Sequence, residues 1–144
     1  MGTTETVIAE ALHKAHVALL DDLQQLEEAV RPPSKEGLPE LRARLGAAHH
    51  HVTAHFRFEE HNGYMTAVRK REPRLERTIQ QLAEEHGKLR ASLEAIVASA
   101  QAAARLDDAL RAAVQEWIGC MRLHEARENN LVQGVFNLDI GAED

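Results

Sequence analysis

The amino-acid sequence predicts an all-α protein, an up-down-up-down bundle of four helices in one domain spanning residues 1–144. Apolar residues recur every three or four positions along four stretches, as on the buried side of amphipathic helices. Short connections join these stretches, so neighbouring helices are expected to be antiparallel. The expected helices cover residues 4–30, 39–69, 73–103 and 107–134, and an irregular tail follows at 136–144.

The first expected helix begins at residues 3–5, whose side chains suit capping and the positive N-terminal dipole. His16 interrupts the apolar stripe of this helix, and His13 lies one turn back and to the side. Pro32 and Pro33 end the helix, because proline removes a backbone donor and restricts the residue before it.

The second helix begins near Pro39, which suits a first helical turn. Its stripe runs into His55 and Glu59, where a helix facing a core should carry Leu or Val. No Lys or Arg shares the stripe, and an unpaired carboxylate in an apolar interior is costly, so Glu59 requires another positive partner. Asn62-Gly63 could end this helix, although we expect it to continue to residue 69.

The third helix has His86 in register with its leucines. The fourth follows a weak boundary and is capped by Asp107 or Asp108. Its stripe includes His124 and Glu128, whose spacing of four places both side chains on one face, one turn apart.

Six polar side chains should therefore meet at one depth in the bundle. They lie at similar numbers of residues from the connections between helices, and with ~1.5 Å of rise per residue this places them at similar heights. The expected metal ligands are His16, His55, Glu59, His86, His124 and Glu128. One histidine on such a stripe would indicate a hydrogen-bonded core residue, whereas six such side chains indicate a metal centre. Imidazoles with carboxylates suit iron, manganese or zinc rather than calcium or magnesium. Since six ligands are too many for one tetrahedral zinc, we expect two ions bridged by Glu59 and Glu128.

Four motifs follow one another in order: His16 with its trailing leucines, and residues 55–60, 85–89 and 124–129. Together they resemble the hemerythrin-like, HHE cation-binding domains, over nearly the whole chain. The resemblance implies a non-haem di-iron centre with an oxo or hydroxo bridge, with zinc or manganese as alternatives. It also implies that the centre binds dioxygen, peroxide or nitric oxide, and the family's ligand roles fall on the six residues named above.

One position departs from the family pattern. Oxygen-carrying hemerythrins place a second histidine one turn from the one on the third helix, whereas this chain has Leu82 and Arg90 on either side of His86. The coordination position is expected to be open or filled from elsewhere, which favours reactivity or sensing over simple oxygen carriage. Candidate ligands or hydrogen-bond partners of ligands are Tyr64, His51, Glu60 and His13. Tyr64 is the preferred donor because a bend at the preceding glycine could turn it inward, while Glu60 is rotated about 100° from the residue before it and should face solvent.

Composition restricts partners and location. A net charge of −6 and 3% aromatic residues disfavour a nucleic-acid surface. No apolar run is long enough for a membrane span and no signal peptide is recognisable, so we expect no membrane partner. The single cysteine, Cys120, excludes an internal disulfide and fits the cytoplasm. The sequence leaves the oligomeric state open.

Three functions are compatible with these observations. The first is a di-iron protein that binds dioxygen, peroxide or nitric oxide for sensing, storage or detoxification. The second is a di-iron enzyme that turns over peroxide or nitric oxide. The third is a structural or interaction bundle that holds zinc or no metal.

Overall fold

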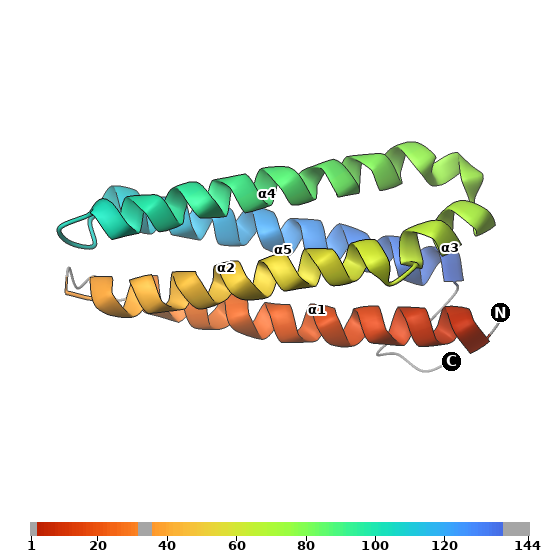
Figure 1. Ribbon diagram of the computed structural model, residues 1–144, viewed down its shortest axis with the longest axis horizontal. Helices are drawn as coiled ribbons and strands as arrows, with labels where there is room; N and C mark the ends of the chain where they lie inside the picture. Colours follow the sequence, from red (N-terminus) through yellow and green to blue (C-terminus); the bar gives the residue numbers. More distant parts are fainter. Residues whose placement is uncertain (1–2, 32–35, 137–144) are drawn as a thin grey trace.

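The structure, a computed structural model, describes residues 3–31 and 36–136. Within these ranges the chain is helical and contains no strand. The elements are α1 (Thr3–Val30), α2 (Leu38–His61), α3 (Tyr64–Arg71), the short 3-10 helix η1 (Pro73–Leu75), α4 (Glu76–Ala102) and α5 (Asp108–Phe136). The four long helices lie side by side, and α3 sits at the end of the bundle where α2 gives way to α4 (Figure 1).

The long helices form a bundle in which α1 and α4 each pack against both α2 and α5. Successive long helices run in opposite directions along the axis (Figure 1). The predicted all-α bundle is therefore confirmed as an architecture. The predicted count of four helices is not, because the described ranges contain five α-helices.

The additional helix arises at Asn62 and Gly63, where the sequence analysis expected one helix from residue 39 to residue 69. Gly63 adopts φ 93°, a left-handed conformation that glycine tolerates better than any residue with a Cβ. The Oδ1 of Asn62 accepts a hydrogen bond of 3.0 Å from the backbone N–H of Tyr64, which closes the turn. The helix therefore ends at His61, and the chain continues as the separate helix α3 at the end of the bundle (Figure 1).

The remaining helix boundaries lie close to those expected. Asp107 is the residue that caps α5, since its Oδ1 accepts a hydrogen bond of 2.8 Å from the N–H of Leu110. Phe136 was placed in the irregular tail, but it is helical and buried at the end of α5. Residues 137–144 of the expected tail, and the two prolines after α1, lie outside the described residues.

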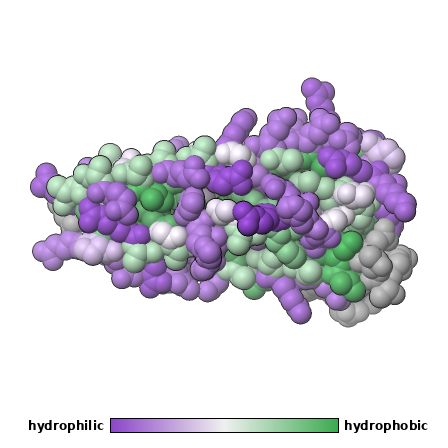
Figure 2. All heavy atoms as spheres, in the orientation of Figure 1, coloured by the Kyte–Doolittle hydropathy of each residue, from purple (hydrophilic) through white to green (hydrophobic). Residues whose placement is uncertain are grey.

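The core consists of two apolar clusters. One, which includes Leu23 and Leu45, fills the half of the bundle toward the α1–α2 and α4–α5 connections. The other, which includes Leu12, Ile79 and Val132, lies beneath α3. Hydrophilic side chains dominate the outer face seen in Figure 2, with smaller apolar areas between them. None of the helices in the described ranges has a stretch long and apolar enough to cross a membrane.

Candidate metal centre

The structure brings all six of the expected ligands together inside the bundle. One comes from α1, two from α2, one from α4 and two from α5. Every one of them is buried, with at most 7% of its surface exposed: His16, His55, Glu59, His86, His124 and Glu128. The helical period explains the convergence, because each residue occupies the position on its stripe where a leucine would otherwise pack.

Glu125 is a seventh member of this cluster, and the sequence analysis did not identify it. It is 2% exposed, and its Oε1 accepts a hydrogen bond of 2.9 Å from Nε2 of His55. The same oxygen lies 3.3 Å from Nε2 of His16. Its position three residues before Glu128 was a usable signal, because residues three apart share a helical face.

The donor atoms form two groups that overlap in two carboxylates. The first contains His16, His55 and Glu125, the second contains His86 and His124, and both include Glu59 and Glu128. Within each group the donor atoms lie no more than 4.8 Å apart. The centre can therefore be described as two neighbouring ion positions that share two carboxylates.

Glu59 reaches both positions with different oxygens. Its Oε2 lies 3.1 Å from Nε2 of His16 and 2.9 Å from Nε2 of His55. Its Oε1 lies 3.1 Å from Nε2 of His86. A carboxylate in this arrangement can place one oxygen on each of two ions.

Glu128 also lies between the two positions. Its Oε2 is 3.2 Å from Nε2 of His86, and its Oε1 is 3.4 Å from Nε2 of His124 and 3.7 Å from Nε2 of His16. All four imidazoles therefore direct Nε2 toward the shared carboxylates, as ligands around common ions would.

Several buried atoms of the cluster have no hydrogen-bond partner among the described residues. They are Nδ1 of His16, Oε1 of Glu59, Oε2 of Glu125, Oε1 of Glu128 and Nε2 of His124. A buried polar atom without a partner is costly, and bound cations would satisfy those of these atoms that coordinate them. The residues present therefore fit a metal centre.

The carboxylates of the cluster raise the pKa of the histidines beside them. Burial alone would lower the pKa of His16, but hydrogen bonds with Glu128 and Glu59 raise it to about 10. The pKa of His86 is likewise raised to about 10 by the same two carboxylates, against the effect of burial. Burial would also lower the pKa of His55, which Glu125 and Glu59 raise to about 9. Ion binding would displace these protons, since an imidazole must be neutral to ligate a metal.

Tyr64 lies against the cluster, as the bend at Gly63 was expected to allow. It is fully buried, and its hydroxyl donates a hydrogen bond of 2.7 Å to Oε2 of Glu128, the oxygen nearest His86. Burial and the neighbouring carboxylates of Glu128 and Glu59 raise the pKa of this phenol. Tyr64 is thus placed on the side of Glu128 that faces His86.

Glu60 and Glu85 contact the outer ring nitrogens of two histidines. Oε2 of Glu60 lies 3.1 Å from Nδ1 of His86, although the Glu60 side chain is 43% exposed. Glu60 therefore faces solvent as expected and also contacts a candidate ligand. Glu85, which the sequence analysis did not identify, accepts a hydrogen bond of 2.7 Å from Nδ1 of His124.

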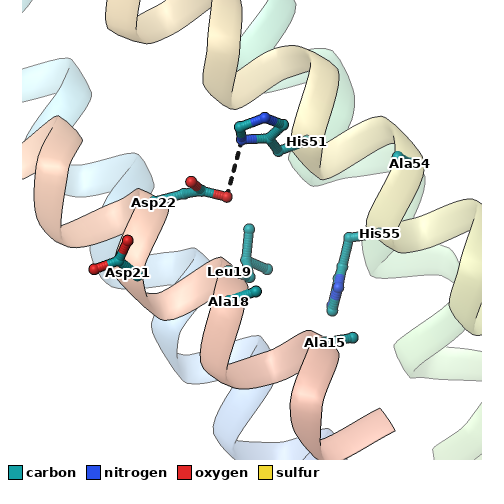
Figure 3. A pocket seen from close by; sticks show the side chains of 8 residues that line it. All are labelled: Ala15, Ala18, Leu19, Asp21, Asp22, His51, Ala54 and His55. Atoms are coloured by element: carbon teal, nitrogen blue, oxygen red, sulfur yellow. Dashed lines mark ion pairs between the residues drawn. The ribbon is translucent and has the colours of Figure 1, made fainter. Parts of the chain in front are cut away.

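The structure does not bring the other two candidates, His51 and His13, into the cluster. His51 lies in the wall of the groove between α1 and α2, where its Nδ1 is 3.0 Å from Oδ2 of Asp22 on α1 and its side chain is 48% exposed (Figure 3). His13 lies beside a surface groove that also borders His16. Neither residue belongs to the donor groups found among the described residues, so a role for His51 or His13 at the centre stays a prediction.

Two surface grooves are bordered by side chains of the donor group that contains His16, His55 and Glu125. The groove between α1 and α2 has a volume of about 510 Å³, and His55 lies in its wall beside small residues that include Ala18 (Figure 3). The groove between α1 and α5, of about 240 Å³, is bordered by His16 and Glu125. At the other position, the ring of His86 stacks on Phe56 with a centroid distance of 4.1 Å. The two positions therefore differ in how close they lie to the surface.

Fold and site together define a helical bundle whose buried histidines and carboxylates could hold metal ions. Comparison with protein families matches residues 7–136 to the Hemerythrin HHE cation binding domain. The chain belongs to this family, which confirms the resemblance seen in its motifs. Neither the curated proteins nor the solved structures contain a match to the chain.

Proposed function

We propose that this chain is a non-haem di-iron protein that binds dioxygen, peroxide or nitric oxide, for sensing, storage or detoxification. The observation that carries the proposal is the pair of overlapping donor groups, which share Glu59 and Glu128. Two shared carboxylates fit a pair of adjacent ions, because each can contribute one oxygen to either ion.

The donor chemistry supports iron as the metal. Mixed imidazole and carboxylate ligands suit iron, manganese or zinc, and they disfavour the all-oxygen sites of calcium and magnesium. When bound, iron supplies a redox-active centre at which a small molecule can coordinate. The protein contributes His16, His55 and Glu125 to one position and His86 and His124 to the other. The apolar clusters on both sides of this layer limit the access of water.

An enzyme that turns over peroxide or nitric oxide is the second candidate. It is favoured by the groove that reaches His55 and by the absence of a histidine one turn from His86, where Leu82 is buried. Multiple-turnover assays under defined peroxide or nitric oxide distinguish it from a binding protein. Sustained turnover supports the enzyme, and a single stoichiometric reaction supports a sensor or a store.

The proposed partner is a small diatomic molecule or peroxide, and the proposed location is the cytoplasm. The grooves beside the candidate ligands suit a small molecule. Cys120 is exposed and is the single cysteine of the chain, which fits a reducing compartment.

Metal analysis tests the proposal directly. Metal-free protein loaded anaerobically with ferrous iron should retain close to two ions per chain, and the oxidised protein should change its visible spectrum when azide or nitric oxide is added. Glu59→Ala and Glu128→Ala should each impair loading, because each variant removes a donor from both positions. Saturation at one ion, a preference for zinc, or a centre that responds to none of these ligands would contradict it.

A further inference from the structure

In two of the four inward histidines, the ring nitrogen that faces away from the cluster lies within hydrogen-bond distance of a carboxylate. Nδ1 of His86 lies 3.1 Å from Glu60, and Nδ1 of His124 lies 2.7 Å from Glu85. In both rings Nε2 points inward, toward Glu128, at 3.2 and 3.4 Å. A carboxylate on one imidazole nitrogen fixes the tautomer and the rotation of the ring, and it raises the basicity of the other nitrogen.

The other two histidines are held differently. Nδ1 of His16 is buried without a hydrogen-bond partner in the part of the chain that the structure describes. The ion pairs of His55 run through its Nε2, to Glu59 and Glu125. The outer carboxylates thus serve the His86–His124 position, and residues 3–31 and 36–136 supply no equivalent carboxylate contact at the His16–His55 position.

Both outer carboxylates are sequence neighbours of an inward ligand. Glu59 points into the cluster from α2, and Glu60, rotated about 100° around the helix, reaches sideways to His86 on α4. In the same way His86 points inward from α4, and Glu85 reaches sideways to His124 on α5. The arrangement connects three helices in sequence and orients both histidines of one position.

A further contact holds each of these two carboxylate–histidine pairs in place. Glu85 also forms an ion pair with Arg127, one turn beyond His124 on α5. The ring of His86 is held between the Glu60 contact and the face of Phe56, whose plane is inclined by 6° to it. Neither imidazole is therefore free to rotate away from the ion position.

We propose that Glu60 and Glu85 are positioning residues that make the His86–His124 position the tighter of the two, so that it fills first. This inference rests on the proposed two-ion centre. Removing a carboxylate that holds a metal-ligating histidine typically lowers metal affinity about 10–100-fold. The loss should fall on one position, because the other has no such carboxylate.

Anaerobic titration of the metal-free protein with Co²⁺, followed by calorimetry and visible absorption, measures the two steps separately. The wild-type protein should bind two ions in two distinguishable steps. Glu60→Gln and Glu85→Gln should weaken the first step about 10–100-fold and leave the capacity at two. Glu94→Gln is the matched control, because Glu94 also contacts a histidine, His49 at 3.2 Å, but that histidine lies outside the cluster.

A second readout separates positioning from a merely structural role. In protein loaded with diamagnetic Zn²⁺, nitrogen-15 NMR should show a hydrogen-bonded Nδ1–H on His86 and His124. Glutamine at 60 or 85 retains an acceptor oxygen but not the negative charge that raises the basicity of the ring, whereas alanine removes both. The alanine variants should therefore lose this signal, and the glutamine variants should keep it while binding the first ion more weakly. Both sites are partly exposed, at 43% and 25%, so the substitutions are expected to preserve the fold, and circular dichroism checks this.

The outcomes distinguish this inference from the proposed function. Two ions that bind with equal affinity in the wild-type protein overturn the inference and leave the two-ion centre standing. The inference is also overturned if Glu94→Gln weakens the first binding step as much as Glu60→Gln and Glu85→Gln do, or if those two variants weaken only the second step. A capacity of one ion or none in the wild-type protein overturns both.

Discussion

Replacing Glu125 with glutamine removes one negative charge from the centre and keeps the shape of the side chain. The carboxylate contacts His55 at 2.9 Å and lies 3.3 Å from His16. It belongs to one donor group and not to the other. The substitution should therefore weaken one ion position and spare the other.

The expected size of the effect follows from linkage between binding and folding. An ion at 100 times its dissociation constant stabilises the fold by ~2.7 kcal/mol, and a hundredfold weaker site at the same concentration contributes only ~0.4 kcal/mol. The difference of ~2.3 kcal/mol corresponds to a fall of roughly 7 °C in Tm, at about 3 °C per kcal/mol for a domain of this size. Metal content after desalting should fall from two ions to one.

The assay compares thermal unfolding of wild-type, Glu125→Gln and Glu116→Gln proteins, each with and without metal. Glu116 lies exposed on the same helix and serves as the control. The metal-dependent rise in Tm should be smaller in Glu125→Gln alone. Two retained ions with an unchanged rise in Tm would refute the assignment of Glu125 as a ligand and leave it as a hydrogen-bond partner of His55.

Three further predictions concern the tyrosine, the groove and pH. The ferric protein should show a visible phenolate band that Tyr64→Phe abolishes; an unchanged spectrum would leave Tyr64 as a hydrogen-bond donor to Glu128. Ala18→Leu should fill the groove beside α1 and slow azide binding in stopped-flow traces without changing iron content, and an unaltered rate would show that entry occurs elsewhere. In the metal-free protein, His16 and His86 have raised pKa values, so their protonated imidazoles stabilise the fold. This contribution is complete below pH 6.5 and is lost as the pH rises toward 10. Urea midpoints from pH 6 to pH 10 should fall accordingly in the metal-free protein and not in the loaded one.

Much of the fold and of the candidate centre could be predicted from helical periodicity. The pattern that continues an apolar stripe into His55 and Glu59, and repeats at His124 and Glu128, marks the inward faces of two helices. These faces are local properties, since 3.6 residues per turn determines which side chains share a face. The buried depth of His86 followed from the same rule, because it stands where a leucine would.

The residues that were missed depend on neighbouring helices. Glu125 stands next to His124 on α5, and both are buried, because the inward face of this helix is wider than a single stripe. The spacing of three between Glu125 and Glu128 indicates that the two can share a face, but whether Glu125 is buried depends on how closely the neighbouring helices approach. The same holds for Glu85, which was not a candidate and which reaches His124 on α5.

By itself, the sequence determined that this chain is an all-α bundle with histidines and carboxylates on its inward faces. These residues lie on apolar stripes, and the stripes must face the core to be buried. Tertiary structure alone decided that Tyr64, which follows the break at Gly63, meets Glu128. It also decided which ring nitrogens face inward and which carboxylates hold the others. These features depend on contacts between residues that are far apart in the chain. A difference of a few ångströms decides whether a side chain is a ligand or only a neighbour of one, and helical periodicity does not determine such distances.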